Sequence, residues 1–472
     1  MKHKLVIVKL LVILIAIPLY ACASPFLQSN LNGVWEGSVE MPGILKKHVI
    51  IRFSTTGKNL SGTLDVPTSR TFGFALRDLR LSERNVSFTL PLGESGKLQF
   101  DGRIEKDTIK GGVSGAGLPG TFSLKLSNKE SKVSPPNQFE RKKRDYFPTT
   151  EWKTSEPQAH GIDPKRLGDA EKFVLEKLPE VRSLLVVRNG KLVYEKYFRG
   201  ATAKDAFNIK SVTKSFTSAL IGIALRDGVL RTTDEKLPDL LPDYFNSETD
   251  SRKKQITLRH LLTMTAGFDW RENEQITARW LQSPNYVKFT LDLPLAAEPG
   301  KVQNYNTGLS HLLSAIITEK SKTNALDFAR KHLCEPIGIR IGRWDTAPEG
   351  FYEGGSEMYL TARDMARFGF LYLNVGEWEG RQIVPAEWVR ESTSPQTGKD
   401  PLWADYGYQW WVGGDDDTPS FSALGYGGQA IHVVPKLDLV VVVTSTVNDA
   451  RNPVTMLISE YVVPAVIEQE KR

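Results

Sequence analysis

The sequence predicts a mixed α/β chain of the α+β kind, in which a small all-β barrel or sandwich precedes a larger domain. The larger domain is expected to hold an antiparallel sheet flanked by helices, plus a helical insert. Two observations support this. Short alternating apolar runs separated by turn clusters fill residues 31–127. From residue 159 to 470, strand patterns lie at both ends and helical periodicity lies between them.

Composition and charge narrow the classes of function. The 472 residues are 40% hydrophobic and 25% charged, which excludes disorder, collagen and coiled coil for the whole chain. The formal net charge of +6 includes Lys2, Lys4 and Lys9 of an apolar leader, and it is too small to indicate nucleic acid as a partner. The 7 histidines are scattered, with no HExxH and no Cys/His cluster, so we expect no metal and no cofactor.

Residues 1–23 are predicted to be a secretory signal peptide. A basic start precedes the apolar stretch Leu10–Leu19, which is shorter than the ~20 residues of a membrane span. Ala21-Cys22-Ala23 fits simple cleavage and secretion, whereas Leu19-Tyr20-Ala21-Cys22 resembles a bacterial lipobox, with Tyr20 atypical. We favour the second interpretation, with a lipid on Cys22 and membrane attachment through it. The chain would then be exported to the periplasm or the outer surface. Its oligomeric state is not readable from the sequence.

The first domain, residues 31–127, is expected to be a β-meander that closes or stacks to hide its edges. Gly33-Val34-Trp35 opens its first strand and is reminiscent of lipocalins, but a tryptophan that plugs one end of a barrel is the better explanation. Gly115–Gly120 spells GxGxxG, but Pro119 lies inside it and no helix follows, so it is a turn. Further strands are expected at His48–Ser54, Leu60–Val66, Leu76–Ser82, Val86–Leu90, Leu98–Glu105 and Thr108–Ser114.

Residues 128–158 are expected to be a linker, because they contain Pro135-Pro136, few aliphatic residues and the basic run Arg141–Arg144. We expect that basic run to be solvated, with a role at a membrane surface as the minor alternative.

The second domain, residues 159–470, begins and ends with hairpins. Asn189-Gly190 joins the expected strands Ser183–Val187 and Leu192–Phe198, and a dipeptide of this type is a strong hairpin signal. A second hairpin, Ala430–Val434 with Leu437–Thr444, turns at Pro435-Lys436. A closing helix is expected over Met456–Ile467, bent or interrupted at Pro464. We therefore expect a single antiparallel sheet to which both ends of this domain contribute strands. Cys334 is expected in the core.

Ser-x-x-Lys occurs at Ser211–Lys214 and at Ser251–Lys254. The second copy lies in a polar stretch with no apolar face, which indicates a surface loop. Ser211 opens an amphipathic helix that ends near Gly228, and residues i and i+3 of a helix share a face. On the motif alone, an N-cap serine and a surface lysine are the favoured interpretation. A catalytic serine needs a neighbour to take its proton, which a lysine or tyrosine with a lowered pKa can do.

Five further segments accompany the first motif in a fixed order. Together with Asn208–Gly222, the chain resembles the serine β-lactamase, penicillin-binding protein and family VIII esterase superfamily, related to class C β-lactamases. The spellings LLTMTAG and YNTG are most similar to 6-aminohexanoate-oligomer hydrolases and related esterases. No GxSxG motif of α/β-hydrolases is present. The further segments are Ile256–Phe268, Glu298–Ser321, Gly354–Asn374, Asp405–Val412 and Gly425–Thr444.

The resemblance implies a role for individual residues. Ser211 would be the nucleophile, Lys214 would hold or pass on its proton, and Tyr305 would act as general base and then as acid. The backbone N–H groups of Ser211 and of Tyr426, on the edge strand, would form the oxyanion hole. The residues expected to bind substrate are Asn306, Thr307, Gly425 and Gly427.

Two departures from the family pattern bear on the substrate. The motif Tyr-x-Asn becomes Tyr305-Asn306-Thr307. In the family, the asparagine of this motif orients the lysine and the substrate amide, so Thr307 would weaken that orientation. The third motif, a basic residue-x-Gly, becomes Ala423-Leu424-Gly425, so no side chain there holds a substrate carboxylate. Both departures argue against a β-lactamase or a D-Ala-D-Ala carboxypeptidase.

We therefore expect a serine hydrolase that cleaves a small ester or amide through an acyl-enzyme. Two alternatives stay open. The chain could be a non-catalytic envelope protein whose β domain holds an apolar ligand beside a relic hydrolase domain. It could also be a cell-wall D-amino-acid peptidase.

Overall fold

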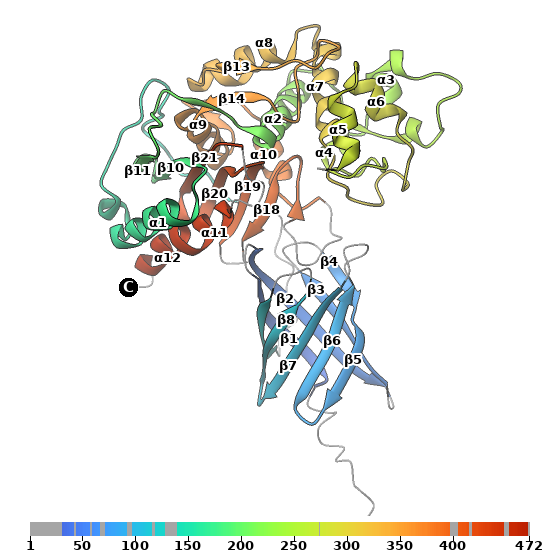
Figure 1. The fold of residues 1–472 in the computed structure, drawn as a ribbon, viewed down its shortest axis with the longest axis vertical. Coiled ribbons are helices and arrows are strands. Elements are labelled where there is room, and N and C mark those ends of the chain that lie inside the picture. The colour runs from blue at the N-terminus through green and yellow to red at the C-terminus, as the bar shows by residue number, and fades with distance from the viewer. Residues whose placement is uncertain are drawn as a thin grey trace, which may run out of the picture.

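The computed structural model shows two parts, a β-barrel-like sheet and a C-terminal mixed α/β domain (Figure 1). The predicted signal peptide and Cys22 lie outside the described residues. Within the described part of the chain, no helix has the length and apolar character needed to span a membrane. The structure describes residues 31–41, 44–56, 59–66, 71–91, 97–115, 119–127, 139–272, 274–396, 405–414, 418–447 and 453–470.

The N-terminal part is a nine-stranded antiparallel sheet in the order β4-β3-β2-β1-β9-β8-β7-β6-β5. Its two ends approach each other, because the backbone N–H of Leu76, between β4 and β5, donates to Gly62 O in β3 at 2.9 Å. The expected meander is confirmed, with additional strands. The bounds are β1 Gly33–Met41, β2 Ile44–Thr56, β3 Asn59–Val66, β4 Thr71–Ala75, β5 Arg77–Ser82, β6 Asn85–Pro91, β7 Lys97–Glu105, β8 Thr108–Ser114 and β9 Gly120–Ser127.

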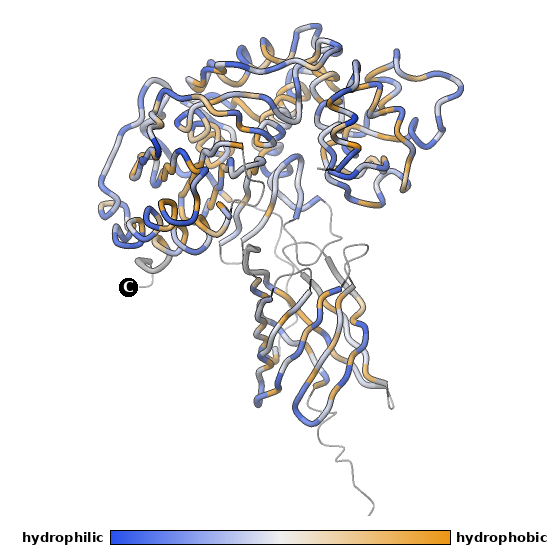
Figure 2. Tube along the Cα trace, in the orientation of Figure 1, coloured by the Kyte–Doolittle hydropathy of each residue, from blue (hydrophilic) through white to orange (hydrophobic). Residues whose placement is uncertain are grey.

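Aromatic side chains fill the described interior of the barrel. Trp35 is fully buried and donates from Nε1 to Leu31 O at 2.8 Å, so it closes one end. Phe88 and Phe100 stack with their centroids 4.7 Å apart, and Phe122 meets both rings edge-on. Each buried ring contributes roughly 2–3 kcal/mol. The strands alternate hydrophilic and hydrophobic residues (Figure 2), as expected for one buried and one solvated face.

The C-terminal sheet has the order β11-β10-β21-β20-β19-β18-β17, so strands from both ends of the domain pair in its centre. The expected hairpin turn is confirmed, since Asn189 and Gly190 both have positive φ, 49° and 75°. Strand β18 also lies against β2 of the barrel. The bounds are β10 Val181–Arg188, β11 Lys191–Tyr197, β17 Asp405–Tyr406, β18 Trp411–Gly414, β19 Pro419–Gly425, β20 Gln429–Val434 and β21 Leu439–Ser445.

Helices cover both faces of this sheet and form two hydrophobic cores. On one face lie α2 (Thr213–Arg226), α7 (Thr307–Ser321) and α9 (Ala362–Leu373). The other face carries α1 (Pro164–Lys177) and the closing helix. That helix is interrupted by the π-helical stretch Leu457–Val462 and not at Pro464, which lies inside α12 (Val463–Glu470). Cys334 is fully buried and free.

A helical insert lies between α2 and α7 and is built from short helices. Its helices are α3 Leu237–Leu240, α4 Leu258–Leu262, α5 Gln275–Leu281 and α6 Tyr286–Asp292. Outside the insert, short elements complete the domain: β12 Ala206–Asn208, β13 Arg343–Trp344, β14 Met358–Thr361, β15 Glu377–Trp378, β16 Arg381–Gln382, α8 Ala325–Ala329, α10 Ala386–Ser392 and α11 Val454–Met456.

The described part of the expected linker packs on the C-terminal domain. Phe139 stacks on Phe421, with centroids 5.9 Å apart. Arg144 forms a bidentate ion pair with Asp438 and also donates to Asn374 Oδ1 at 2.9 Å. The expectation that the Arg141–Arg144 run is solvated is therefore wrong for Arg144, because a buried carboxylate in the β20–β21 turn binds it. Nothing in the run itself indicated that partner.

Candidate active site

Ser211 lies where a strained turn meets a buried helix. Strand β12 ends at Asn208, whose Oδ1 accepts the backbone N–H of Lys210 at 2.9 Å. Lys210 has a φ of 48°, in the left-handed region that side chains other than glycine rarely adopt. A short 3-10 turn, Lys210–Val212, then leads into α2. Ser211 is partly exposed, whereas the residues that follow it from Val212 to Ala224 are buried.

Lys214 lies one helical turn after Ser211, in the position that the motif spacing predicts. Its Nζ lies 3.0 Å from Ser211 Oγ, 3.0 Å from Thr307 Oγ1 and 2.9 Å from Gly355 O. Three partners satisfy the three donors of an ammonium group. The side chain is 1% exposed, so the alternative of a surface lysine is wrong.

Burial lowers the pKa of Lys214 from its ordinary value to about 8, although the carboxylates of Glu272 and Glu353 act in the opposite direction. A substantial fraction of the amine is therefore neutral near pH 8. A neutral amine beside a hydroxyl can accept its proton, which is the requirement for activating a serine.

Tyr305 reaches Ser211 from a loop that ends at the start of α7. The interaction of its hydroxyl with the nearby Ser211 lowers the pKa of Tyr305, although burial has the larger effect and raises it. The Nζ of Lys214 lies 5.1 Å from its ring centroid. Burial raises the pKa of Tyr305 above its ordinary value, so the phenol keeps its proton at neutral pH. The structure thus brings together the three side chains that the sequence singled out.

Thr307 performs a task that the sequence analysis did not expect of it. Its Oγ1 accepts from Lys214 Nζ and donates to Glu272 Oε1 at 2.7 Å. Its backbone N–H donates to Glu272 Oε2 at 3.0 Å, and Trp270 Nε1 donates to the same oxygen at 2.7 Å. The substitution of Thr307 for the family asparagine therefore keeps a polar partner for Lys214.

Sequence reasoning missed Glu272, because it lies in a loop with no motif around it. The loop is held near Tyr305 by Asn304, whose Nδ2 donates to Trp270 O at 2.7 Å. More than thirty residues separate Asn304 from Trp270 in the chain, so only the packing of the loop shows that the Glu272 carboxylate is linked to Lys214 through Thr307.

The predicted oxyanion hole lies at the end of β19. A Cβ added to Gly425 would lie 2.4 Å from Ile209 O and 3.2 Å from Ser211 N, so this strand end passes directly beside the serine backbone. Tyr426 follows in the turn from β19 to β20. The expectation that Tyr426 lies on the edge strand is wrong, because β18 and β17 extend the sheet beyond β19.

The remaining predicted substrate-binding residues differ in exposure. Asn306 is 1% exposed at the start of α7, and its Oδ1 has no hydrogen-bond partner among the described residues. Gly427 lies in the β19–β20 turn with a φ of 80°. The partly exposed ring of Trp411 stacks on Tyr305, with centroids 5.5 Å apart, and adds an aromatic wall beside Ser211.

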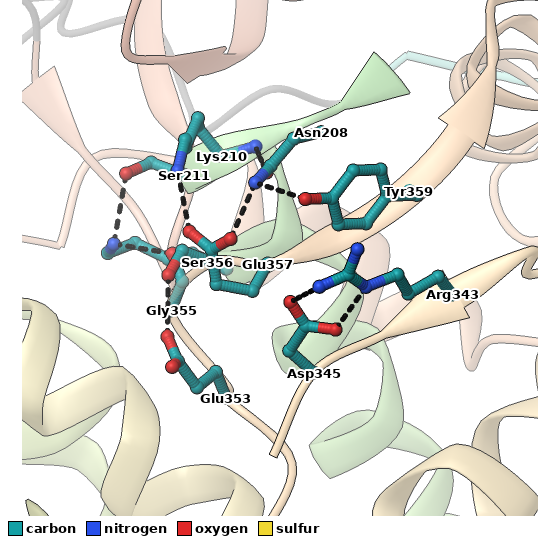
Figure 3. Close-up of polar contacts among 11 residues, drawn as sticks. Asn208, Lys210, Ser211, Arg343, Asp345, Glu353, Gly355, Ser356, Glu357 and Tyr359 are labelled. Atoms are coloured by element: carbon teal, nitrogen blue, oxygen red, sulfur yellow. Dashed lines mark hydrogen bonds and ion pairs between the residues drawn. The ribbon is translucent and has the colours of Figure 1, made fainter. Parts of the chain in front are cut away.

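The segment from Glu353 to Glu357 contacts residues on both sides of Ser211 (Figure 3). Gly355 O binds Lys214, while Glu357 forms an ion pair with Lys210 at 2.6 Å. Glu357 also accepts from Asn208 Nδ2 at 2.6 Å. Like Lys210, Glu357 has a left-handed φ, 61°. Two strained residues therefore hold each other next to the nucleophile, which is where stored backbone strain commonly occurs.

Glu353 is the second carboxylate that acts on Lys214. It is 7% exposed and accepts from Ser356 Oγ at 2.9 Å (Figure 3). Burial raises its pKa to about 7. In the described part of the chain, no group of three or more His, Cys, Asp or Glu side chains could hold a metal ion.

Comparison with known proteins agrees with this geometry. A family model described as Beta-lactamase matches residues 178–458, more than half of the chain. The chain therefore belongs to the beta-lactamase family, whose members are hydrolases, and the resemblance seen in the sequence is confirmed.

Individual relatives are distant. The 6-aminohexanoate-dimer hydrolase of Paenarthrobacter ureafaciens is 23% identical over 309 residues, which cover 60% of this chain and 76% of that protein. A Bacillus anthracis protein assigned as a 6-aminohexanoate-dimer hydrolase has a TM-score of 0.57 at 23% identity, over 71% of this chain and 89% of its own. A family VIII carboxylesterase has a TM-score of 0.52 at 14% identity, over 64% of this chain and 97% of that chain. Likeness to the two solved structures shows the fold alone.

Proposed function

We propose that the chain is a serine hydrolase that cleaves an ester or an amide bond through an acyl-enzyme on Ser211. The observation that carries the proposal is the cluster of a partly exposed serine, a buried amine 3.0 Å from its Oγ and a tyrosine whose ring centroid lies 5.1 Å from that amine. Membership of a family of hydrolases supports it.

In acylation, Ser211 Oγ attacks the substrate carbonyl carbon and its proton passes to the neutral amine of Lys214. The sequence analysis gave the role of base to Tyr305. The opposite pKa shifts of the two groups favour Lys214 instead, since its pKa is lowered to about 8 while that of Tyr305 is raised. Negative charge on the carbonyl oxygen would be stabilised by the backbone N–H groups of Ser211 and Tyr426.

Tyr305, protonated at neutral pH, would donate its proton to the leaving oxygen or nitrogen as the scissile bond breaks. Lys214, now protonated, can replace that proton, so the net transfer is from Ser211 to the leaving group. Water then enters, loses a proton to the same groups and releases the acid, which returns Ser211 to its starting state.

We infer a substrate whose reacting end is apolar or aromatic and carries no carboxylate beside the scissile bond. Tyr305, Tyr406 and Trp411 form an aromatic cluster next to the site, with centroids 5.0–5.9 Å apart. The third motif, Ala423-Leu424-Gly425, carries no cation. A short ester or a linear amide fits these features better than a β-lactam, in agreement with the activities named for the relatives.

The alternative in which the barrel binds an apolar ligand has less support. Its described interior is occupied by stacked aromatic side chains, and in the hydrolase site the amine of Lys214 lies 3.0 Å from the hydroxyl of Ser211.

The experiment is active-site labelling with a fluorophosphonate probe, with turnover measured over activated esters, linear amides, cephalosporins and D-alanyl dipeptides. Wild type should be labelled and should turn over short esters or amides, whereas Ser211→Ala should do neither. Ser251→Ala, in the second Ser-x-x-Lys copy, is the matched control and should behave as wild type. Equal labelling of Ser211→Ala and wild type would remove the proposal, and turnover of D-alanyl dipeptides alone would redirect it to a cell-wall peptidase.

We also propose that the chain is exported and anchored through a lipid on Cys22. Metabolic labelling with an alkyne fatty acid in a bacterial host should mark wild type and not Cys22→Ala. Secretion of unlabelled wild type would select simple cleavage instead.

A further inference from the structure

The outer face of the barrel carries a groove surrounded by cations. A hollow of about 460 Å³ lies over strands β5 to β8. Its cationic lining residues are Arg80, Arg103 and Lys110, and all three are exposed. The barrel register explains the clustering. Arg103 lies directly opposite Lys110 in the β7–β8 pair, and Arg80 is one rung away on the same face.

This arrangement has an unfavourable electrostatic feature. Like charges directly opposite each other on antiparallel strands repel. Among the described residues, none of the three cations has an ion-pair or hydrogen-bond partner, although Asp101 lines the same hollow. A cross-strand arginine–lysine pair without a carboxylate between its members is the arrangement expected where an external anion supplies the missing charge.

The groove floor can also bind an anion. Ser82, Asn85 and Ser87 line it, and their hydroxyl and amide groups can donate hydrogen bonds. Arginine presents a planar fork of N–H groups that matches the oxygens of a phosphate, and lysine adds a point charge. Small polar floor residues below long cationic side chains therefore suit a compact, phosphate-bearing group and do not suit an apolar ligand.

The position of the groove indicates the source of that phosphate. Arg103 and Lys110 lie close to the β7–β8 turn, and Arg80 lies close to the β5–β6 turn. Both turns are at the end of the barrel opposite the C-terminal domain (Figure 1). The first described residues lie at this same end, because Leu126, which pairs with Trp35 of β1, donates its N–H to Asp107 O in the β7–β8 turn.

We propose that this basic groove binds the phosphate headgroups of an anionic membrane and so holds the barrel end on a lipid surface, with the hydrolase domain turned away from it. The proposal does not depend on the chemistry of Ser211. Each Lys or Arg near an anionic surface contributes about 1 kcal/mol, so three together act as a substantial electrostatic anchor.

The test is co-sedimentation of the full chain with vesicles of phosphatidylcholine alone or with one third phosphatidylglycerol. The triple variant Arg80→Ala/Arg103→Ala/Lys110→Ala should lose about 100-fold in partitioning onto the anionic vesicles. The matched control, Lys165→Ala/Lys172→Ala/Lys177→Ala, removes the same charge from exposed positions on α1 and should lose less than about threefold. Both variants keep the leader, so any contribution of the leader cancels.

Equal losses in the two variants, or unchanged binding of the groove variant, would overturn the proposal. If the wild-type chain binds inorganic phosphate at millimolar concentration and the groove variant does not, while neither binds vesicles, the groove takes a soluble phosphate and the membrane assignment is wrong. The groove variant should give the same circular dichroism spectrum as wild type, which checks that it folds. Ser211→Ala should sediment like wild type, which separates this test from that of the proposed hydrolase activity.

Discussion

The amine of Lys214 and the hydroxyl of Thr307 lie 3.0 Å apart, and the same hydroxyl donates to Glu272 at 2.7 Å. Lysine, threonine and glutamate thus form one hydrogen-bonded chain that ends at the nucleophile. Because Thr307 has one hydroxyl with both donor and acceptor capacity, it satisfies a buried cation on one side and a carboxylate on the other.

Removal of this hydroxyl should impair catalysis more than folding. Thr307→Val would leave the Lys214 donor and the Glu272 acceptor without their hydrogen-bond partner. Leaving such buried groups unpaired costs about 1–3 kcal/mol, so we expect kcat to fall about 10- to 100-fold. Thr307→Ser keeps the hydroxyl and should stay within about threefold of wild type. Steady-state kinetics on the best ester distinguish the two variants. Equal losses in both would show that the methyl group, and not the hydrogen bond, matters.

Activity should rise with pH through the titration of Lys214. The amine must be neutral to accept the proton of Ser211, and its pKa is lowered to about 8, so kcat/KM should increase up to about pH 8 and then level off. The charge of Glu272 raises that pKa, so Glu272→Gln should move the rising limb to lower pH. A limb that moves to higher pH, or no change in its midpoint, would contradict the assignment of Lys214 as the base.

The sequence could predict the barrel and the two hairpins because each depends on a local pattern, whereas the roles of Ser211, Lys214 and Tyr305 came from the family resemblance. Alternation marks the strands, Asn189-Gly190 marks a turn, and Ser211 with Lys214 is a helical i, i+3 pair. The sequence could not reveal Glu272 or Glu357, because their partners lie far away in the chain and are brought near by packing of loops without periodicity. Arg144 differs from its expected solvation for the same reason, since its partner Asp438 comes from the other end of the domain.

Gly425 should be irreplaceable for geometric reasons. A Cβ at this position would lie 2.4 Å from Ile209 O, a backbone atom that cannot move aside without displacing the Ser211 turn. Gly425→Ala should lower kcat/KM about 100-fold by disturbing the oxyanion donors, a loss similar to that of one donor. Gly168→Ala on α1 is the control, because nothing lies within 4 Å of a Cβ there. Unchanged activity in Gly425→Ala would exclude this strand end from the site.

The strained backbone before the nucleophile predicts an unusual ranking of substitutions. Lys210 has a φ of 48°, which glycine adopts freely and alanine does not, so Lys210→Gly should be more stable than Lys210→Ala by about 1 kcal/mol. Both variants lose the ion pair with Glu357, so the comparison isolates the backbone term. Urea unfolding followed by tryptophan fluorescence measures the difference. Equal midpoints would show that the left-handed conformation carries no strain.

Glu353 should make the protein less stable as pH rises. Its pKa is about 7 in the folded chain but near 4.3 when unfolded, so both states are neutral below about pH 4. Between pH 4.3 and 7 the unfolded chain ionises this group and the folded chain does not, which lowers the free energy of unfolding by roughly 3 kcal/mol by pH 8. Glu353→Gln is neutral at every pH and lacks this loss, so its gain in thermal midpoint over wild type should be larger at pH 8 than at pH 5. Because the side-chain amide of this variant keeps an acceptor for the hydroxyl of Ser356, the fold should persist, and an equal gain at both pH values would show that Glu353 is already ionised in the folded protein.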